Sequence, residues 1–203
     1  MKAPLGRFTA LQRTLHWLMA AAILAMLFIG VAMVSTLQPR YWTLVSVHRP
    51  LGILILLLVL LRLGLRSWRG APPLPADLSW SQVAAAKGSH VLLYALMIAT
   101  PLVGWSMLSA GGYPIVLYGP IHLPQIMPHD DALHALLWSA HRWLAFLFFT
   151  TILLHLAAAL FHGLVRQDGV FSSMAPWPLR QRKPARAIDT STVQPPDEDL
   201  AGV

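Results

Sequence analysis

Four long apolar stretches constrain the fold of this chain more than any other feature. They cover about residues 15–34, 44–65, 90–108 and 143–165, and each is close to the roughly 20 residues that a helix needs to cross a bilayer. Hydrophobic residues make up 56% of the chain and charged residues 11%, whereas soluble domains carry about 25% charged residues. The sequence therefore predicts an all-α membrane protein built as a bundle of four transmembrane helices.

The basic residues indicate how this bundle is oriented. Of the 15 lysines and arginines, 12 precede the first stretch, lie between or at the ends of the second and third, or follow the fourth. The positive-inside rule then places both termini in the cytoplasm. The net charge of +7 is explained by these flanks against anionic lipid, so no nucleic-acid partner is implied.

The chain is predicted to contain one folded unit. Residues 1–175 form the four-helix transmembrane domain, and residues 176–203, rich in proline and charge, are expected to be a disordered cytoplasmic tail. The longest outer connection, residues 109–137, contains several glycines and prolines. We expect it to fold back over the bundle as a lid.

Histidines occur in the apolar stretches at matching depths. His141 and His155 are separated by about four helical turns, so they share one helix face and lie roughly 21 Å apart along the axis. Chain direction places His48 near the outer face, level with His141. It places His16 and His90 near the inner face, level with His155. Ionisable groups at such depths are costly and indicate a function.

These depths predict two b haems (iron protoporphyrin IX), each with two histidine ligands, and an electron path across the membrane. The outer haem takes His48 and His141, and the inner haem takes His155 with either His16 or His90. The chain has no cysteine, so both haems would be bound non-covalently. A proton relay, as in a proton-coupled transporter, is the competing explanation. It is disfavoured because no Asp or Glu falls within the four stretches.

Three arginines and one glycine accompany the predicted ligands. Arg49 and Arg142 each follow an outer histidine, where they could pair with haem propionates or draw in a small anion. Arg62, 14 residues after His48, could serve the inner haem. Interfacial snorkelling is the alternative for each arginine. Gly52, one turn after His48, is expected to leave space for a porphyrin face.

An ordered set of residues resembles the bacterial cytochrome b561 family, which includes the membrane superoxide oxidase and is related to the b-type cytochrome subunits of nickel–iron hydrogenases. The resemblance covers about residues 5–175. Its carriers are Arg7, Leu15-His16-Trp17, His48 with Gly52 and Arg62, His90-Val91-Leu92-Leu93-Tyr94 with Pro101 and Gly104, Ser139-Ala140-His141, and Leu154-His155-Leu156-Ala157-Ala158-Ala159 with His162.

The resemblance implies a four-helix bundle that holds two b haems in the bacterial inner membrane. By position, it pairs His16 with His155 as ligands of one iron. It pairs His48 with His141 as ligands of the other. His90 also matches a family histidine, and we assign it to the quinone region.

The resemblance further implies an oxidoreductase that oxidises superoxide at the outer face and reduces ubiquinone. An electropositive outer mouth at Arg49 and Arg142 suits an anionic donor, and Lys87 or His90 would protonate the quinone. His162 is interpreted as a polar helix-end group in preference to a quinone-site proton donor. The second interpretation is a cytochrome subunit that relays electrons between the quinone pool and a periplasmic hydrogenase, dehydrogenase or small electron carrier.

Overall fold

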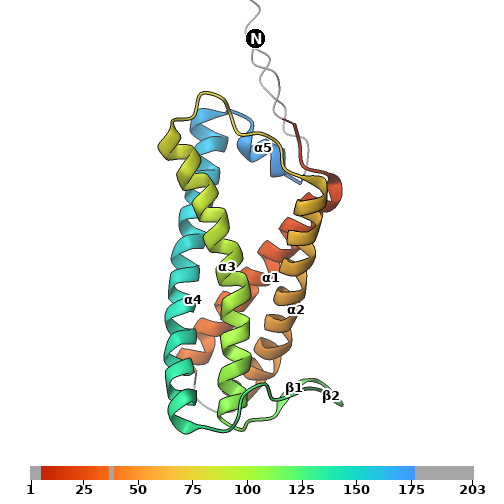
Figure 1. Cartoon of the computed structure of the whole chain (residues 1–203), viewed down its shortest axis with the longest axis vertical. Coiled ribbons are helices and arrows are strands. Elements are labelled where there is room, and N and C mark those ends of the chain that lie inside the picture. The colour runs from red at the N-terminus through yellow and green to blue at the C-terminus, as the bar shows by residue number, and fades with distance from the viewer. Residues whose placement is uncertain (1–5, 37–38, 177–203) are drawn as a thin grey trace, which may run out of the picture.

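A computed structural model of the chain describes residues 6–36 and 39–176. Four long helices form a bundle, in which α1 crosses the others obliquely (Figure 1). They are α1 (Ala10–Ser35), α2 (Arg40–Arg69), α3 (Trp80–Ala110) and α4 (Asp131–Leu160). Each is long and apolar enough to cross a membrane, so the predicted four-helix transmembrane bundle is confirmed. The predicted tail lies outside the described residues, apart from its first residue.

Three of the four long helices, α1, α3 and α4, begin at capping residues and not at the first apolar residue. Thr9 and Ser79 open α1 and α3 with capping boxes. Asp130 opens α4, where its carboxylate accepts a hydrogen bond from the Leu133 backbone N–H at 2.9 Å. Side chains that satisfy the first free N–H groups of a helix fix where it starts. As a result, α4 begins at Asp131, well before the apolar stretch that predicted it.

The outer connection forms a hairpin of two antiparallel strands, β1 (Ile115–Tyr118) and β2 (Ile121–Leu123). The hairpin extends sideways past the start of α2 (Figure 1), so it does not cover the bundle as the expected lid would. The chain after it is fixed on the end of α3. There the Trp105 indole N–H donates to the Pro124 carbonyl at 2.9 Å, and the Ile126 N–H donates to the Ser109 hydroxyl at 3.2 Å.

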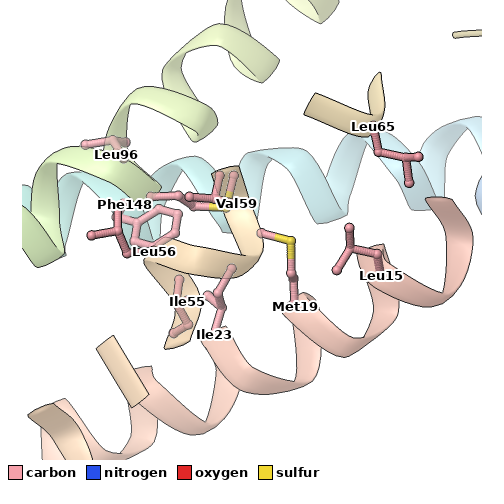
Figure 2. Packing of buried hydrophobic residues seen from close by; sticks show 10 residues of the cluster. Leu15, Met19, Ile23, Ile55, Leu56, Val59, Leu65, Leu96 and Phe148 are labelled. Carbon is pink, nitrogen blue, oxygen red and sulfur yellow. The ribbon is translucent and has the colours of Figure 1, made fainter. Parts of the chain in front are cut away.

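The hydrophobic core lies between the four helices (Figure 2). It consists of Leu15, Met19 and Ile23 from α1, Ile55, Leu56, Val59 and Leu65 from α2, Leu96 and Met97 from α3, and Phe148 from α4. Phe148 is seven residues from both His141 and His155. Seven residues are about two helical turns, so the core lies between the levels of these two histidines on the same face of α4.

The helices associate mainly as two pairs. The most extensive contacts join α1 to α2 and α3 to α4, with α2 and α3 in contact between the pairs. At its C-terminal end, α4 continues into a π-helical segment, η1 (Phe161–Arg166), which is followed by the short helix α5 (Val170–Met174). α5 is held on the start of the chain, because the Phe8 N–H donates to the Ser173 carbonyl at 3.2 Å.

Candidate functional site

The predicted outer pair comes together between α2 and α4. The ring centres of His48 and His141 are 6.1 Å apart, and their planes are inclined by 73°. Nδ1 of His141 lies 3.1 Å from the Thr100 carbonyl oxygen on α3, so it serves as the donor and Nε2 stays free. Nδ1 of His48 is buried and has no hydrogen-bond partner among the described residues. Buried polar atoms normally have a partner, which suits a ring that binds a ligand.

α3 is shaped to receive the His141 ring. A Cβ atom placed on Gly104 would lie 3.1 Å from Cε1 and 3.3 Å from Nδ1 of His141. Such distances are shorter than ordinary van der Waals contacts between carbon atoms, which are about 3.5–4.0 Å. Because Gly104 has no side chain, the imidazole can lie close to the α3 backbone and reach the Thr100 carbonyl. Gly104 therefore positions the ring.

At the inner level, three histidines converge. The ring centre of His155 on α4 is 6.4 Å from that of His16 on α1 and 5.4 Å from that of His90 on α3. His16 and His155 are half-buried, whereas His90 is exposed. Nδ1 of His90 lies 2.6 Å from the carbonyl oxygen of Ala86 in its own helix. Lys87, one turn before His90, is exposed.

The ring separations test whether these pairs fit an iron. An imidazole nitrogen binds a first-row metal at about 2 Å, and the ring centre lies about 1 Å behind it, so two rings on opposite sides of one metal have centres roughly 6 Å apart. The 6.1 Å of His48–His141 and the 6.4 Å of His16–His155 fit this geometry. The 5.4 Å of His90–His155 is shorter.

The number of protein ligands also bears on the cofactor. Within residues 6–36 and 39–176, no three His, Cys, Asp or Glu side chains are grouped closely enough to hold a metal ion. A bare zinc ion would need at least three protein ligands. Two opposed imidazoles are what an iron needs when a porphyrin supplies its remaining ligands. The donor set therefore fits haem better than a free metal ion.

The arginines are distributed between the two levels. Arg49 donates through a terminal guanidinium nitrogen to the Pro114 carbonyl at 3.2 Å, and Arg142 is exposed. Arg62 donates to the Gln12 carbonyl at 3.2 Å and lies within electrostatic range of His16 and the other inner histidines. Arg49 and Arg142 thus adjoin the His48–His141 pair along the chain, and Arg62 lies near the other histidines; their roles toward haem propionates or a small anion stay predictions.

Gly52 faces α1. A Cβ atom at this position would lie 3.6 Å from the terminal methyl of Met26, an ordinary packing distance. The expectation that Gly52 leaves space for a porphyrin stays a prediction. Gly104, which the sequence indicated only as part of the family resemblance, is the glycine whose missing side chain is next to a candidate ligand.

Comparison with known proteins decides the family. A family model described as prokaryotic cytochrome b561 matches residues 7–177. The chain belongs to this family. Membership implies a b-type haem and electron transfer across a membrane, and it makes this multi-pass protein an oxidoreductase of the cytochrome b561 type.

Individual relatives of this cytochrome b561 family member are similar at modest identity. Cytochrome b561 homolog 2 of Escherichia coli (strain K12) is 28% identical over 173 residues, which cover 83% of this chain and 90% of the relative. A protein named probable superoxide oxidase CybB, of Yersinia pestis, is 29% identical over 175 residues, which cover 84% and 96%. Cytochrome b561 homolog 1 of E. coli is 26% identical over 182 residues.

A carboxylate that sequence reasoning missed connects the segments beyond the inner end of α4. Asp168 accepts hydrogen bonds from Nδ1 of His162 at 2.7 Å, from Nε of Arg166 at 2.9 Å and from the Val170 N–H at 3.2 Å. Arg166 also pairs with Asp77, in the α2–α3 connection, at 3.2 Å. His162 thus has a structural partner, in keeping with its interpretation as a helix-end group.

Asp168 should make stability depend on pH. Burial raises the pKa of the Asp168 carboxyl, but the hydrogen bonds from His162, Val170 and Arg166 outweigh this and bring the pKa below its ordinary value. A carboxyl with a lowered folded-state pKa stabilises the protein above its unfolded pKa of about 3.9. That contribution is lost as the pH falls through the folded-state pKa.

We therefore expect Asp168→Asn to reduce the free energy of unfolding by about 1.5–3 kcal/mol at pH 7, the usual loss for hydrogen bonds to a charged group. The difference from the unmodified protein should shrink below about pH 4. Thermal unfolding between pH 7 and pH 3 measures both effects. Asp131→Asn is the control, because this side chain is 94% exposed. A difference that stays constant over the whole pH range would contradict the role of the Asp168 charge.

Proposed function

We propose that this chain is a di-haem b cytochrome that takes electrons from superoxide at the outer face and delivers them to ubiquinone at the inner face. The observation that carries the proposal is the presence of two histidine pairs, at two levels of one bundle, each with the ring separation that suits an iron. Two b haems, when bound, supply the one-electron transfer between the faces.

The proposed ligands are His48 with His141 and His16 with His155. The His141 ring is held by the Thr100 carbonyl, and such a hydrogen bond from the second ring nitrogen orients a metal-binding imidazole and makes it more basic. His16 is preferred to His90 because its separation from His155 fits and because it is half-buried.

The outer arginines favour an anionic donor. Arg142 is exposed beside the outer pair, and Arg49 keeps further N–H donors besides the one used on Pro114; a guanidinium has five. Positive charge at the mouth raises the local concentration of a small anion. The relative named probable superoxide oxidase CybB supports superoxide as that anion.

The inner face is proposed to serve the quinone. Two superoxide anions would each lose one electron and leave as O₂, and one ubiquinone would take both electrons with two protons to become ubiquinol. Lys87 and His90 are exposed at the inner end of α3. With Nδ1 of His90 on the Ala86 carbonyl, Nε2 is the atom that would exchange a proton with the quinone.

The proposed location is the bacterial inner membrane, with both termini in the cytoplasm. Arg62, Arg66 and Arg69 lie near the end of α2, and Arg166 ends η1, so these basic residues gather at one end of the bundle. The positive-inside rule assigns that end to the cytoplasm. The hairpin end then faces the periplasm, where superoxide would arrive.

Stopped-flow mixing with superoxide tests the proposed donor. The haem spectrum of the purified, haem-loaded protein should change rapidly from the oxidised to the reduced form, and added ubiquinone should return it to the oxidised form. The reduction rate should fall with salt, because electrostatic steering is screened over about 8 Å at physiological ionic strength. Arg142→Gln should also slow it. Arg69→Gln removes the same charge from the inner end and should leave the rate unchanged.

The same measurement distinguishes the relay function. Haems that stay oxidised in superoxide but are reduced by a periplasmic redox protein would favour the cytochrome-subunit interpretation. Equal slowing by the two arginine substitutions would show that the effect of charge is not local to the outer mouth.

A further inference from the structure

The hairpin of β1 and β2 is attached firmly to the bundle at its base. Ile115 at the start of β1 is 3% exposed, and the preceding Pro114 carbonyl accepts the hydrogen bond from Arg49 of α2. β1 packs against both α2 and α3. The direction of the hairpin relative to the bundle is therefore fixed by contacts, although its far end projects beyond α2 (Figure 1).

The far end of the hairpin presents an aromatic and an aliphatic side chain together. Tyr118 and Ile121 are direct partners across the two strands, and paired residues of an antiparallel ladder lie side by side on one face. Tyr118 is 83% exposed and Ile121 is 56% exposed. The turn between them is Gly119-Pro120, with Gly119 at a positive φ of 50°.

This segment lacks the charges expected of a loop in water. Residues 113–127 contain no Asp, Glu, Lys or Arg, whereas about four would be expected at the frequency found in soluble domains. Between the hairpin and α2 lies an open groove of about 490 Å³. Its lining is mostly apolar, with Trp42, Val45, Val47, Val116 and Leu117, and it also contains Ser46 and Arg49 from α2.

The position of the hairpin points to the boundary between lipid and water as its surroundings. It lies beside the start of α2 (Figure 1), where Trp42 and Val45 line the groove and the apolar stretch of that helix begins, so the hairpin lies near the boundary between lipid and water. Tyrosine and tryptophan concentrate at that boundary, and Trp42 at the start of α2 is 57% exposed. The outward edges of a two-stranded sheet keep unpaired backbone groups, which exclude it from the hydrocarbon core. The lipid headgroup region suits the exposed aromatic side chains and also offers hydrogen-bond partners to the unpaired backbone groups.

We propose that the β1–β2 hairpin is a membrane-surface anchor that lies in the headgroup region of the outer leaflet, with Tyr118 and Ile121 against phospholipid. Lipid is the proposed occupant because Tyr118, Ile121 and Trp42 expose aromatic and aliphatic side chains together, as residues at the boundary between lipid and water do. The anchor is independent of the cofactors and of the electron donor.

Site-directed spin labelling tests the anchor, and the absence of cysteine makes single labels unambiguous. Tyr118→Cys is labelled in haem-loaded protein reconstituted into phosphatidylcholine–phosphatidylglycerol vesicles. Collisions with oxygen, which concentrates in lipid, are compared with collisions with a water-soluble nickel chelate. Asp131→Cys, at the start of α4, is the control; we expect this position to lie in water because its 94% exposed side chain is a carboxylate and follows another, Asp130. Ile121→Cys provides a second label on the proposed lipid-facing surface.

Labels at 118 and 121 should collide more often with oxygen, and the label at 131 more often with the nickel chelate. The ratio of the two collision rates should thus reverse between the hairpin and the control. Nickel collisions at 118 and 121 equal to those at 131 would overturn the proposal by placing the hairpin in water. Low collision rates with both reagents would also overturn it, because they would show that another protein surface covers the hairpin.

Discussion

Replacing either His48 or His141 with alanine should remove the same haem and leave the other in place. Each substitution takes away one of the two rings that face each other 6.1 Å apart, and loss of one of two axial imidazoles weakens the binding of the haem, so we expect this haem to be lost during purification. The pyridine haemochrome assay should fall from two haems per chain to one. Because the chain has no cysteine, acid–acetone should extract all of the remaining colour.

The inner level supplies the complementary variants. His155→Ala should remove the haem that the outer variants retain, as seen in its absorbance and redox titration. His16→Ala should have the same effect, whereas His90→Ala should keep both haems and slow quinone reduction. His122→Ala, an exposed position in β2, controls for the general loss of an imidazole. If His48→Ala and His155→Ala removed the same spectral component, the assignment of two levels would be wrong.

Gly104→Ala should displace the outer haem although it replaces neither of the proposed ligands. The new methyl group would lie 3.1 Å from Cε1 of His141, so the ring would have to move away from the Thr100 carbonyl that orients it. Loss of such an orienting contact typically weakens metal binding by about 10- to 100-fold. Haem content and the outer-haem midpoint potential measure the effect.

Gly30→Ala is the matched control for this variant. Gly30 also lies within a membrane-spanning helix, α1, and nothing lies within 4 Å of a Cβ atom placed there. Both substitutions raise helix propensity by about 1 kcal/mol, so this gain is the same in each. A similar loss of haem in the two variants would mean that Gly104 matters for helix packing and not for the position of His141.

The arrangement of the spans could be predicted from the sequence because lipid leaves the backbone few choices. The lengths of the apolar stretches predict the four helices, and the direction in which the chain crosses the membrane predicts the depth of each histidine. The pairing of His48 with His141 follows from these two facts alone. The choice between His16 and His90 does not, because both begin an outward-running span and only the three-dimensional structure shows their separations from His155.

Other features depend on interactions that the apolar pattern does not contain. The start of α4 is set by the Asp130 cap and not by hydrophobicity. The hairpin consists of two strands of four and three residues, too short for their alternation to stand out among prolines and glycines. Asp168 lies beyond the apolar stretches, so a search for carboxylates within them could not find it. Its partners are brought to it by η1 and the following turn.

The pairing of the helices has a consequence for how the protein is made. Its extensive contacts join α1 to α2 and α3 to α4, yet both proposed ligand pairs run between these halves, from α4 to α2 and from α4 to α1. Each half can therefore enter the membrane as a helical hairpin before any iron is bound. Cofactor binding would then be the step that joins the two halves. It would require that the two helix pairs of the newly made chain have already packed together in the correct register.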